Sequence, residues 1–512
     1  MTLQQRLATL VCIGVATTIC GAYELSLDWQ ASRDFLLDSD GGDLVIDDGL
    51  GNVITIGATH LFAGGEDILM IKYEPTGVEQ WAVVYNGVIP DSYDVPVDAV
   101  SDGNGNFYLV AQTASIDSPT FTSEWVTMKV NAAGLIVWER RFRGTGTFGS
   151  ALPRDIDLGP NGEIAVTGWV RGDDSFTDFG IAVYEPDGTE RFATQFTSPG
   201  ARADSGDAVA FAPDGSVVIG GQYNTGSQRI VGVLKYDVAG NFLWSETYDA
   251  SALFDLEDRV YSVKVAADGS IYVGADGINS GNEGRDFVLL KYDPAGVLVW
   301  DRRVTAGGSN IAPTVLLGPD ETIYMSGPSD GAYRLVAFDS GGLQQWTETY
   351  PGAVFSDSTR DHAVIDQQGN VAILLYTVPT PGITAFTIVR YASDSTLVDE
   401  TTLDPHGVSR FPTGLATVGV DRLAATGRWS PNGHRDVLTV QLALPESHLL
   451  GDLNCDGLVS VGDIGPFVLA LTDSAGYVAQ FPDCNLNNGD INEDAIVSVG
   501  DIGAFVALLT GG

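Results

Sequence analysis

Two stretches near the end of the sequence place oxygen-bearing residues at one spacing. Each forms a twelve-residue loop with side-chain oxygens at positions 1, 3, 5, 9 and 12, and the backbone carbonyl of position 7 can add one more. Calcium is a hard cation that takes six to eight oxygens from such turned loops. The spacing predicts two calcium sites, against the alternative of two polar turns with chance aspartate spacing. The expected ligands are Asp452, Asn454, Asp456, Leu458, Ser460 and Asp463 in the first loop, and Asp490, Asn492, Asp494, Ile496, Ser498 and Asp501 in the second.

An apolar stretch follows each loop and predicts a short helix. Position 12 is Asp where an ordinary EF-hand has a bidentate Glu. With these features the tail resembles a type I dockerin module over about residues 450–512. The resemblance implies a small α-helical calcium-binding domain that docks to a protein partner, either a cohesin or a cell-surface protein. Positions 10 and 11, where that family often carries hydroxyl residues for cohesin recognition, are Val461-Gly462 and Val499-Gly500, so the chain departs from the family there.

The amino-terminal residues 1–22 have the pattern of a secretory signal peptide, with Arg6 before an apolar core and small residues after it. This predicts a secreted or cell-surface protein. A lipoprotein with Cys20 as the lipidated residue is the alternative. Cleavage leaves only Cys455 and Cys484, which we expect to form one disulfide because exported proteins meet an oxidising environment. The alternative, a metal-binding cysteine pair, lacks a nearby His or further Cys.

Charge and length restrict the class of protein. The chain has 512 residues, enough for two or more domains. It carries 67 acidic and 26 basic residues, a formal net charge of −41, which disfavours nucleic acid and anionic membranes as partners. The charge otherwise serves solubility. No apolar run beyond the signal is long enough to span a membrane.

A repeated frame fills the region between the signal and the tail. An apolar strand ends in Tyr, a tight turn closes on Gly, and a second strand reaches Trp, as in Tyr292, Gly296 and Trp300. The turn glycines stand at 77, 134, 188, 240, 296 and 342, and a degenerate copy has Tyr391, Ser395 and Asp399. A second pattern, Gly-Asn before alternating apolar residues, accounts for two more strands per copy. Four short strands per unit of about fifty residues indicate a propeller blade.

Counting strands predicts how the ring closes. Eight copies have their first three strands, but only seven are followed by a fourth. The strand Glu24–Trp29 can supply the missing one beside Asp436–Leu444, which gives an all-β, eight-bladed propeller over residues 23–445, with a linker at 446–449. The copies resemble bacterial SBBP-type propeller repeats over about residues 24–445. We interpret the repeat Trp residues as packing between blades, and Lys72 and Lys291 as solvated or strand-edge residues.

Catalytic motifs are not evident in the sequence. The five His residues show no metal spacing, and no Gly-x-Ser-x-Gly elbow occurs. We expect a secreted, non-catalytic propeller that binds or scaffolds, joined to a calcium-dependent docking tail. The alternative is a polysaccharide-degrading or polysaccharide-binding component, because dockerin modules are commonly joined to glycoside hydrolases. A more remote alternative is a quinoprotein dehydrogenase-like propeller, although the propeller region has no cysteine pair.

Overall fold

The computed structural model divides into two compact units, one formed by Glu24–Leu444 and the other including Pro445–Gly512. The expected signal peptide, with Cys20, lies outside the described residues. None of the helices in the described part of the chain is both long and apolar enough to cross a membrane. The described residues are 25–33, 40–59, 65–89, 92–114, 123–144, 150–171, 176–199, 203–251, 258–278, 284–305, 310–353, 362–380, 383–403, 410–429, 435–444, 450–455, 459–481, 484, 486–492 and 496–510.

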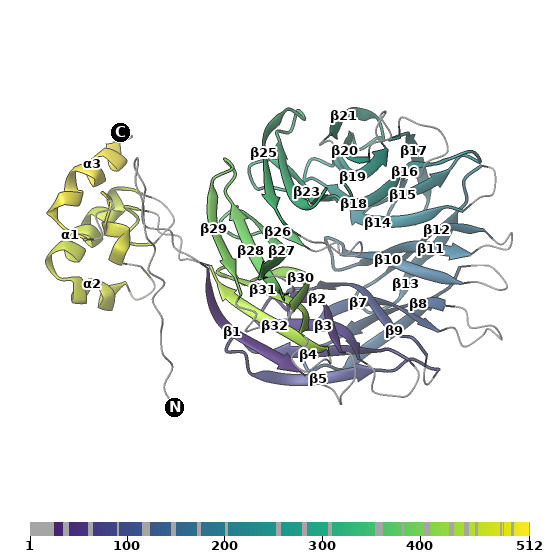
Figure 1. The fold of residues 1–512 in the computed structure, drawn as a ribbon, viewed down its shortest axis with the longest axis horizontal. Helices are drawn as coiled ribbons and strands as arrows, with labels where there is room; N and C mark the ends of the chain where they lie inside the picture. The colour runs from purple at the N-terminus through teal and green to yellow at the C-terminus, as the bar shows by residue number, and fades with distance from the viewer. Residues whose placement is uncertain are drawn as a thin grey trace. The chain divides into compact units, whose positions relative to one another are not determined.

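The first unit consists of eight four-stranded antiparallel sheets, which confirms the predicted eight-bladed propeller (Figure 1). Blades 1 and 2 contain β2 (Gly41–Asp47), β3 (Val53–Thr59), β4 (Asp67–Tyr73), β5 (Glu79–Tyr85), β6 (Val95–Ser101), β7 (Phe107–Ala114), β8 (Ser123–Val130) and β9 (Ile136–Phe142). Blades 3 and 4 contain β10 (Ala151–Leu158), β11 (Ile164–Arg171), β12 (Thr177–Tyr184), β13 (Glu190–Phe196), β14 (Ser205–Phe211), β15 (Val217–Asn224), β16 (Arg229–Tyr236) and β17 (Phe242–Tyr248).

The remaining blades repeat the same order of strands. Blades 5 and 6 contain β18 (Arg259–Val265), β19 (Ile271–Ile278), β20 (Arg285–Tyr292), β21 (Leu298–Val304), β22 (Thr314–Leu317), β23 (Ile323–Ser329), β24 (Ala332–Phe338) and β25 (Gln344–Pro351). Blades 7 and 8 contain β26 (Ala363–Ile365), β27 (Val371–Thr380), β28 (Ile383–Tyr391), β29 (Leu397–Thr402), β30 (Arg410–Val418), β31 (Arg422–Trp429), β32 (Asp436–Ala443) and β1 (Ser26–Arg33).

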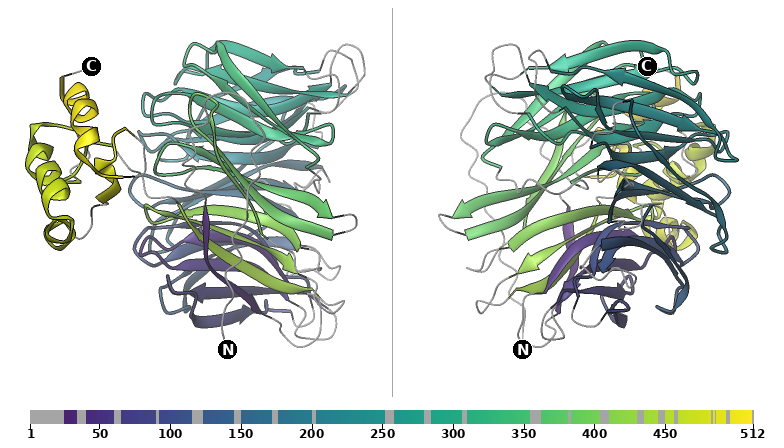
Figure 2. Two further views of the ribbon diagram at one scale, coloured as in Figure 1. Left: turned by 60° about the vertical axis from the view of Figure 1, so that its left-hand side comes forward. Right: turned by 90° about the vertical axis from the view of Figure 1, so that its right-hand side faces the viewer.

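The amino-terminal strand closes the ring as predicted. Strand β1 pairs antiparallel with β32, from Ser26 opposite Ala443 to Arg33 opposite Val437. It starts two residues later than the predicted strand and continues four residues beyond Trp29. In Figures 1 and 2 the purple β1 lies against the yellow-green β32, although the two strands come from opposite ends of the propeller sequence. The edge of β32 is therefore covered.

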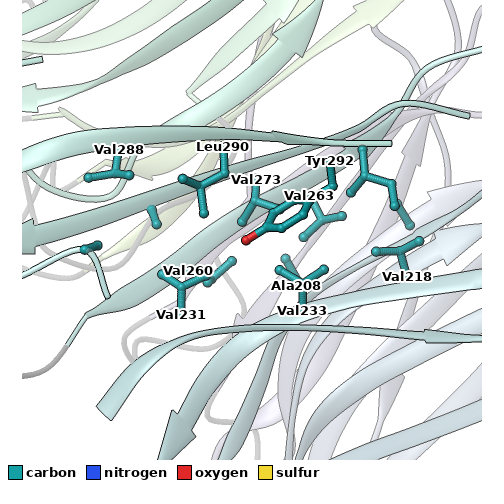
Figure 3. Packing of buried hydrophobic residues seen from close by; sticks show 14 residues of the cluster. Ala208, Val218, Val231, Val233, Val260, Val263, Val273, Val288, Leu290 and Tyr292 are labelled. Carbon is teal, nitrogen blue, oxygen red and sulfur yellow. The ribbon is translucent and has the colours of Figure 1, made fainter. Parts of the chain in front are cut away.

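The core lies between the blades. The second and third strands of most blades are short apolar runs that are buried along nearly their whole length, because a neighbouring blade covers each face of the sheet. Figure 3 shows the cluster between blades 4 and 5, where Ala208, Val231 and Val233 pack with Val260 and Val273. A similar cluster joins blades 8 and 1, so the seam has a core of its own.

The repeat Trp residues connect neighbouring blades, as the sequence interpretation proposed. The ring of Trp81, in the outer strand of blade 1, lies over Gly134 in the turn of blade 2. Its indole Nε1 donates to the carbonyl of Ala132 in the same turn at 3.0 Å. Trp138 does the same with Gly188 and the Pro186 carbonyl, at 3.1 Å. The turn glycine is thus needed for its positive φ and for the room it leaves the ring.

The interpretation of Lys72 as solvated or strand-edge is wrong. Lys72 is buried, and its Nζ lies 2.7 Å from the Oδ2 atom of the buried Asp48. The same Nζ donates to the Ala132 carbonyl in the next blade at 3.4 Å. Lys291 is half-buried and donates to the Ser340 carbonyl at 3.1 Å. The ammonium therefore helps to bind the turn that the Trp covers.

The described residues of the second unit contain three short α-helices and three 3₁₀ turns. Its elements are η1 (Val461–Asp463), α1 (Ile464–Thr472), α2 (Ser474–Gln480), η2 (Leu486–Gly489), η3 (Val499–Asp501) and α3 (Ile502–Thr510). The rings of Phe467 in α1 and Phe505 in α3 pack with centroids 4.3 Å apart. Together with Leu453 and Tyr477 they form a small core, which joins the two halves of this unit.

Candidate functional site

Position 12 of each predicted calcium loop is a buried aspartate that gathers backbone N–H groups. Asp463 and Asp501 are fully buried. The Asp463 Oδ1 atom accepts from the N–H groups of Leu453 and Asn454, at 2.8 and 3.0 Å. In the second loop the Asp501 Oδ1 atom accepts from the N–H of Asn492 at 3.0 Å. Each carboxylate therefore holds the start of its loop against the helix that follows the loop.

Serine at position 9 begins that helix in both loops. The Ser460 hydroxyl accepts from the Gly462 N–H at 3.0 Å, and the Ser460 N–H donates to Asp463 Oδ2 at 2.8 Å. Ser498 repeats both hydrogen bonds, with Gly500 and Asp501, at the same two distances. This reciprocal arrangement is a capping box. The two loops thus share one local geometry.

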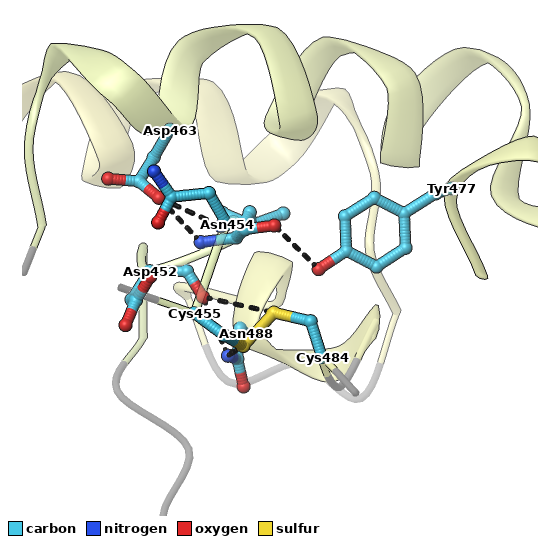
Figure 4. Close-up of a disulfide and its surroundings, with 8 residues drawn as sticks. Asp452, Asn454, Cys455, Asp463, Tyr477, Cys484 and Asn488 are labelled. Atoms are coloured by element: carbon cyan, nitrogen blue, oxygen red, sulfur yellow. Dashed lines mark hydrogen bonds between the residues drawn. A yellow bond between two sulfur atoms is a disulfide. The ribbon is translucent and has the colours of Figure 1, made fainter. Parts of the chain in front are cut away.

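The predicted disulfide between Cys455 and Cys484 is present and joins the first loop to the chain just before η2 (Figure 4). Cys455 occupies position 4 of that loop and adopts a φ of 54°. Beside it, the Asn488 side-chain amide donates to the Asp452 carbonyl at 2.7 Å. The hydroxyl of the buried Tyr477 donates to the Leu453 carbonyl at 3.0 Å. The backbone at positions 1 and 2 of the loop is therefore fixed from three sides.

The aspartates of the first loop affect the pKa of a neighbouring tyrosine. Burial and, to a smaller degree, the charges of Asp452 and Asp463 together raise the pKa of Tyr477 to about 12. The phenol stays protonated and donates its hydrogen bond at any physiological pH. Tyr477 was not singled out from the sequence, because a single Tyr in a helix carries no spacing signal.

Nine of the twelve predicted calcium ligands lie in described residues. Asp456, Leu458 and Asp494 lie outside them. The structure brings Asn454, Ser460 and Asp463 together in the first loop, and Asn492, Ser498 and Asp501 in the second. Within the described ranges no group of three or more His, Cys, Asp or Glu side chains is placed to hold a metal. The donors present are carboxylate, amide and hydroxyl oxygens, a set suited to a hard cation such as calcium.

Each helix that follows a loop exposes the same apolar side chains. Val461, at position 10 of the first loop, is 79% exposed, and Val499, at position 10 of the second, is 77% exposed. Two further exposed residues follow each of them at helical spacing, and the four are Ile464, Val468, Ile502 and Val506. We call Val461–Ile464–Val468 the first stripe and Val499–Ile502–Val506 the second stripe. The repeat in the sequence contained this signal, since the residues stand at the same positions of both copies.

The propeller holds the other residues that were weighed as chemistry. His362 is buried, and burial lowers its pKa to about 4, so the imidazole is neutral in the folded protein. The other four His residues lie outside the described part of the chain. The repeat Trp rings lie over turns of neighbouring blades and are not arranged as a ligand platform.

No protein-family model and no curated protein matches the chain. Solved structures match it at low similarity. A protein of unknown function from Dyadobacter fermentans has 12% identity and a TM-score of 0.39, over 82% of this chain and 99% of that one. The propeller domain of the Trilobed protease from Pyrococcus furiosus has 10% identity and a TM-score of 0.38, over 68% and 93%.

A further match is a puromycin hydrolase mutant, with 15% identity and a TM-score of 0.41 over 80% of this chain. This chain covers 62% of the hydrolase, which is less than two thirds of its length. At such identities and TM-scores, nothing about the chemistry of this chain follows from these proteins.

Proposed function

We propose that this protein is a secreted, non-catalytic propeller that binds its targets outside the cell, and that the dockerin-like second unit docks it to a protein partner when calcium is bound. The observation that carries the proposal is the pair of matching stripes. A monomeric protein gains nothing from exposing Val461 and Val499 almost completely, each just before an exposed Ile and Val of the following helix. Two copies of one surface fit a partner that has an apolar patch.

Calcium acts on this surface through the loops. Both stripes begin at position 10, close to the end of a loop. An ordered loop conformation therefore fixes the orientation in which the stripe is exposed. Without a cation the carboxylates of each loop repel one another, and the ion relieves that repulsion. We therefore expect docking to require calcium and to stop when a chelator removes it.

Capture from the native cell envelope tests the docking role. The full chain is immobilised, the bound proteins are recovered with calcium and with chelator, and the captured protein is then purified for a direct binding measurement. The variant Val461→Ser/Val499→Ser should weaken that binding at least tenfold. Val478→Ser in α2 is the matched control, because Val478 is 51% exposed and belongs to neither stripe. Equal binding by both variants, or binding that ignores chelator, would contradict the proposal.

A polysaccharide-degrading component is the second candidate, and one observation favours it. Asp43, Glu66, Asp98 and Asp155 line a cavity in the propeller, and glycoside hydrolases work with pairs of carboxylic residues. Release of reducing sugars from a panel of glycans separates the two candidates. Turnover would establish the second candidate, and binding without turnover would support the first.

A further inference from the structure

The propeller contains a cavity of about 560 Å³, a volume within the range of small-molecule sites. Most of its lining comes from the first strands of seven blades, namely β2, β6, β10, β18, β22, β26 and β30, and Ala58, Glu66 and Arg428 complete it. These first strands contact their neighbours around the ring, as the order of the blades in Figure 1 allows the reader to follow. The cavity that they line therefore lies near the axis of the propeller.

Most of these strands contain a β-bulge, and the extra residue of the bulge lines the cavity. In six blades the register with the second strand shifts by one residue, which leaves one residue of the first strand unpaired. Such a bulge turns a side chain away from the regular alternation, and bulges are common beside functional sites. The bulged residues are Asp43, Val97, Arg154, Asp207, Tyr261 and Thr413. All of them except Asp207 line the cavity.

The bulged position carries a different residue type in most blades, whereas other positions of the repeat carry similar residues. The residue before the bulge is Gly or Pro in five of the six blades, whereas the bulged residue is acidic, basic, aromatic, apolar or hydroxylic. Packing alone would favour the same residue in every blade, as it does for the repeat Trp. The same β-bulge therefore presents different side chains in different blades, and the lining of the cavity is asymmetric. An asymmetric lining can bind a small asymmetric ligand in one orientation.

Hydrogen bonds hold three acidic side chains of the lining in place on blades 1, 2 and 3. Asp43 Oδ1 accepts from Arg428 at 3.0 Å. Asp98 Oδ1 accepts from the Ala99 N–H at 2.7 Å, and Asp155 Oδ2 accepts from the Val209 N–H at 2.7 Å. These bonds orient the three carboxylates in the lining.

The acidic and basic residues of the lining are nearly equal in number, and the part of the lining from blades 6 and 7 is less polar. Four acidic residues and three basic ones line the cavity, the latter being Arg154, Lys264 and Arg428. Blades 6 and 7 contribute mainly Leu316, Ala363 and Val364, and blade 5 adds the Tyr261 ring. A balanced set of hydrogen-bond donors and acceptors favours a neutral ligand, while the strongly negative chain repels anions.

We propose that this cavity binds a neutral sugar of monosaccharide or disaccharide size. Each sugar hydroxyl both donates and accepts, so neighbouring Asp and Arg side chains such as Asp155 and Arg154 can hold it from two sides. The C–H face of the ring packs against Leu316, Val364 and the Tyr261 ring. This inference deepens the binding role proposed for the propeller by naming its ligand class and its site.

Calorimetric titration of the full chain tests the site. The probes are glucose, galactose, mannose, xylose, N-acetylglucosamine and their common disaccharides, with glucuronate and an alkylammonium salt for comparison. At least one neutral sugar should bind. Arg154→Gln and Asp155→Asn should each weaken it more than about tenfold, because each removes a charged hydrogen-bonding group. Asp207→Asn is the matched control, since Asp207 occupies the same bulge position outside the cavity lining, and it should leave the affinity within about twofold.

Three results would overturn the proposal: no neutral sugar binds, the charged probes bind more tightly than every sugar, or the Arg154 and Asp155 variants bind as well as the unaltered chain. Arg154 is exposed at the cavity wall, so its substitution leaves the fold intact, and the melting temperature of each variant verifies this. The docking test uses substitutions in the second unit, so failure of sugar binding leaves the result for the stripes unaffected.

Discussion

The indole ring of Trp29 lies over Gly77, and this contact crosses the seam of the propeller. A Cβ atom at Gly77 would come within 2.7 Å of the ring, and Trp29 Nε1 donates to the Pro75 carbonyl at 3.0 Å. Trp29 stands in β1, the outer strand of blade 8, whereas Gly77 stands in the turn between β4 and β5 of blade 1. The first and last blades are therefore joined by the same contact that joins Trp81 to Gly134.

Substituting Gly77 by Ala should destabilise the propeller more than a comparable substitution elsewhere. Gly77 has a φ of 80°, where a Cβ costs about 1–2 kcal/mol, and collision with the Trp29 ring adds about 1–3 kcal/mol. Gly226→Ala is the control, because Gly226 has a φ of 91° and open space around it. Urea unfolding of the two variants measures the difference. Equal losses would mean that the ring contact does not restrict this position.

Removing the closing strand should damage the whole propeller. Deletion of residues 24–30 takes away Trp29 and most of the pairing with β32, which leaves the β32 edge exposed. We expect lower solubility or a fall in melting temperature of more than about 10 °C, since the loss exceeds that of a single contact. Leu27→Ser, a substitution at an exposed position of the same strand, is the control. An unchanged melting temperature after the deletion would argue against closure by β1.

Acidity should change the stability of blade 5 through Asp258. Burial raises the pKa of this carboxyl to about 6, while hydrogen bonds from Ser251 and Ala250 oppose the rise. The folded protein then binds the Asp258 proton more tightly than the unfolded chain does, so this group lowers stability as the pH rises from about 4 to about 6. The variant Asp258→Asn has no carboxyl group to ionise at this position, so it does not lose this stability as the pH rises. Its stability relative to the unaltered chain should improve by roughly 3 kcal/mol across this window, as measured by urea unfolding at each pH. A pH-independent difference would contradict this account.

Much of the fold followed from the sequence because its repeat is made of packing residues. The Tyr–Gly–Trp frame marks strands and turns, and counting its copies predicted that β1 completes blade 8. The degenerate seventh copy has a structural reason. Blade 8 has no turn joining its third and fourth strands, since β32 and β1 come from opposite ends of the chain. Blade 7 has no such turn to cover, and Asp399 replaces Trp and pairs with the buried Arg390 at 2.6 Å.

Other features were hidden from sequence reasoning. The burial of Lys72 depends on Asp48, which directly follows the end of β2 in the same blade, so the sequence spacing did not reveal the pair. The cavity was missed because its residues are those that vary from copy to copy. The Gly or Pro before each bulge was the available signal. The two loops could be proposed as calcium sites from the sequence because local spacing alone defines such a loop.

Loss of the disulfide should weaken calcium binding at the first loop only. The bond joins Cys455 at position 4 of that loop to Cys484, across 29 residues of sequence. Replacing both cysteines by Ser should cost the second unit about 3–4 kcal/mol, by the entropy of loop closure. Titration calorimetry should then show one weakened site and one unchanged site, the latter serving as the internal control. Two unchanged affinities would show that the bond does not support the first loop.

Differential scanning calorimetry of the full chain, with calcium and with chelator, tests the central claim most directly. Binding to the folded state alone adds stability that grows with free ligand, so only the unit that holds the calcium sites should respond. We predict two transitions, with chelator lowering that of the second unit by several degrees and leaving that of the propeller within about one degree. If chelator shifts neither transition, or mainly the propeller's, then the assignment of calcium to the loops of Asp463 and Asp501 is wrong.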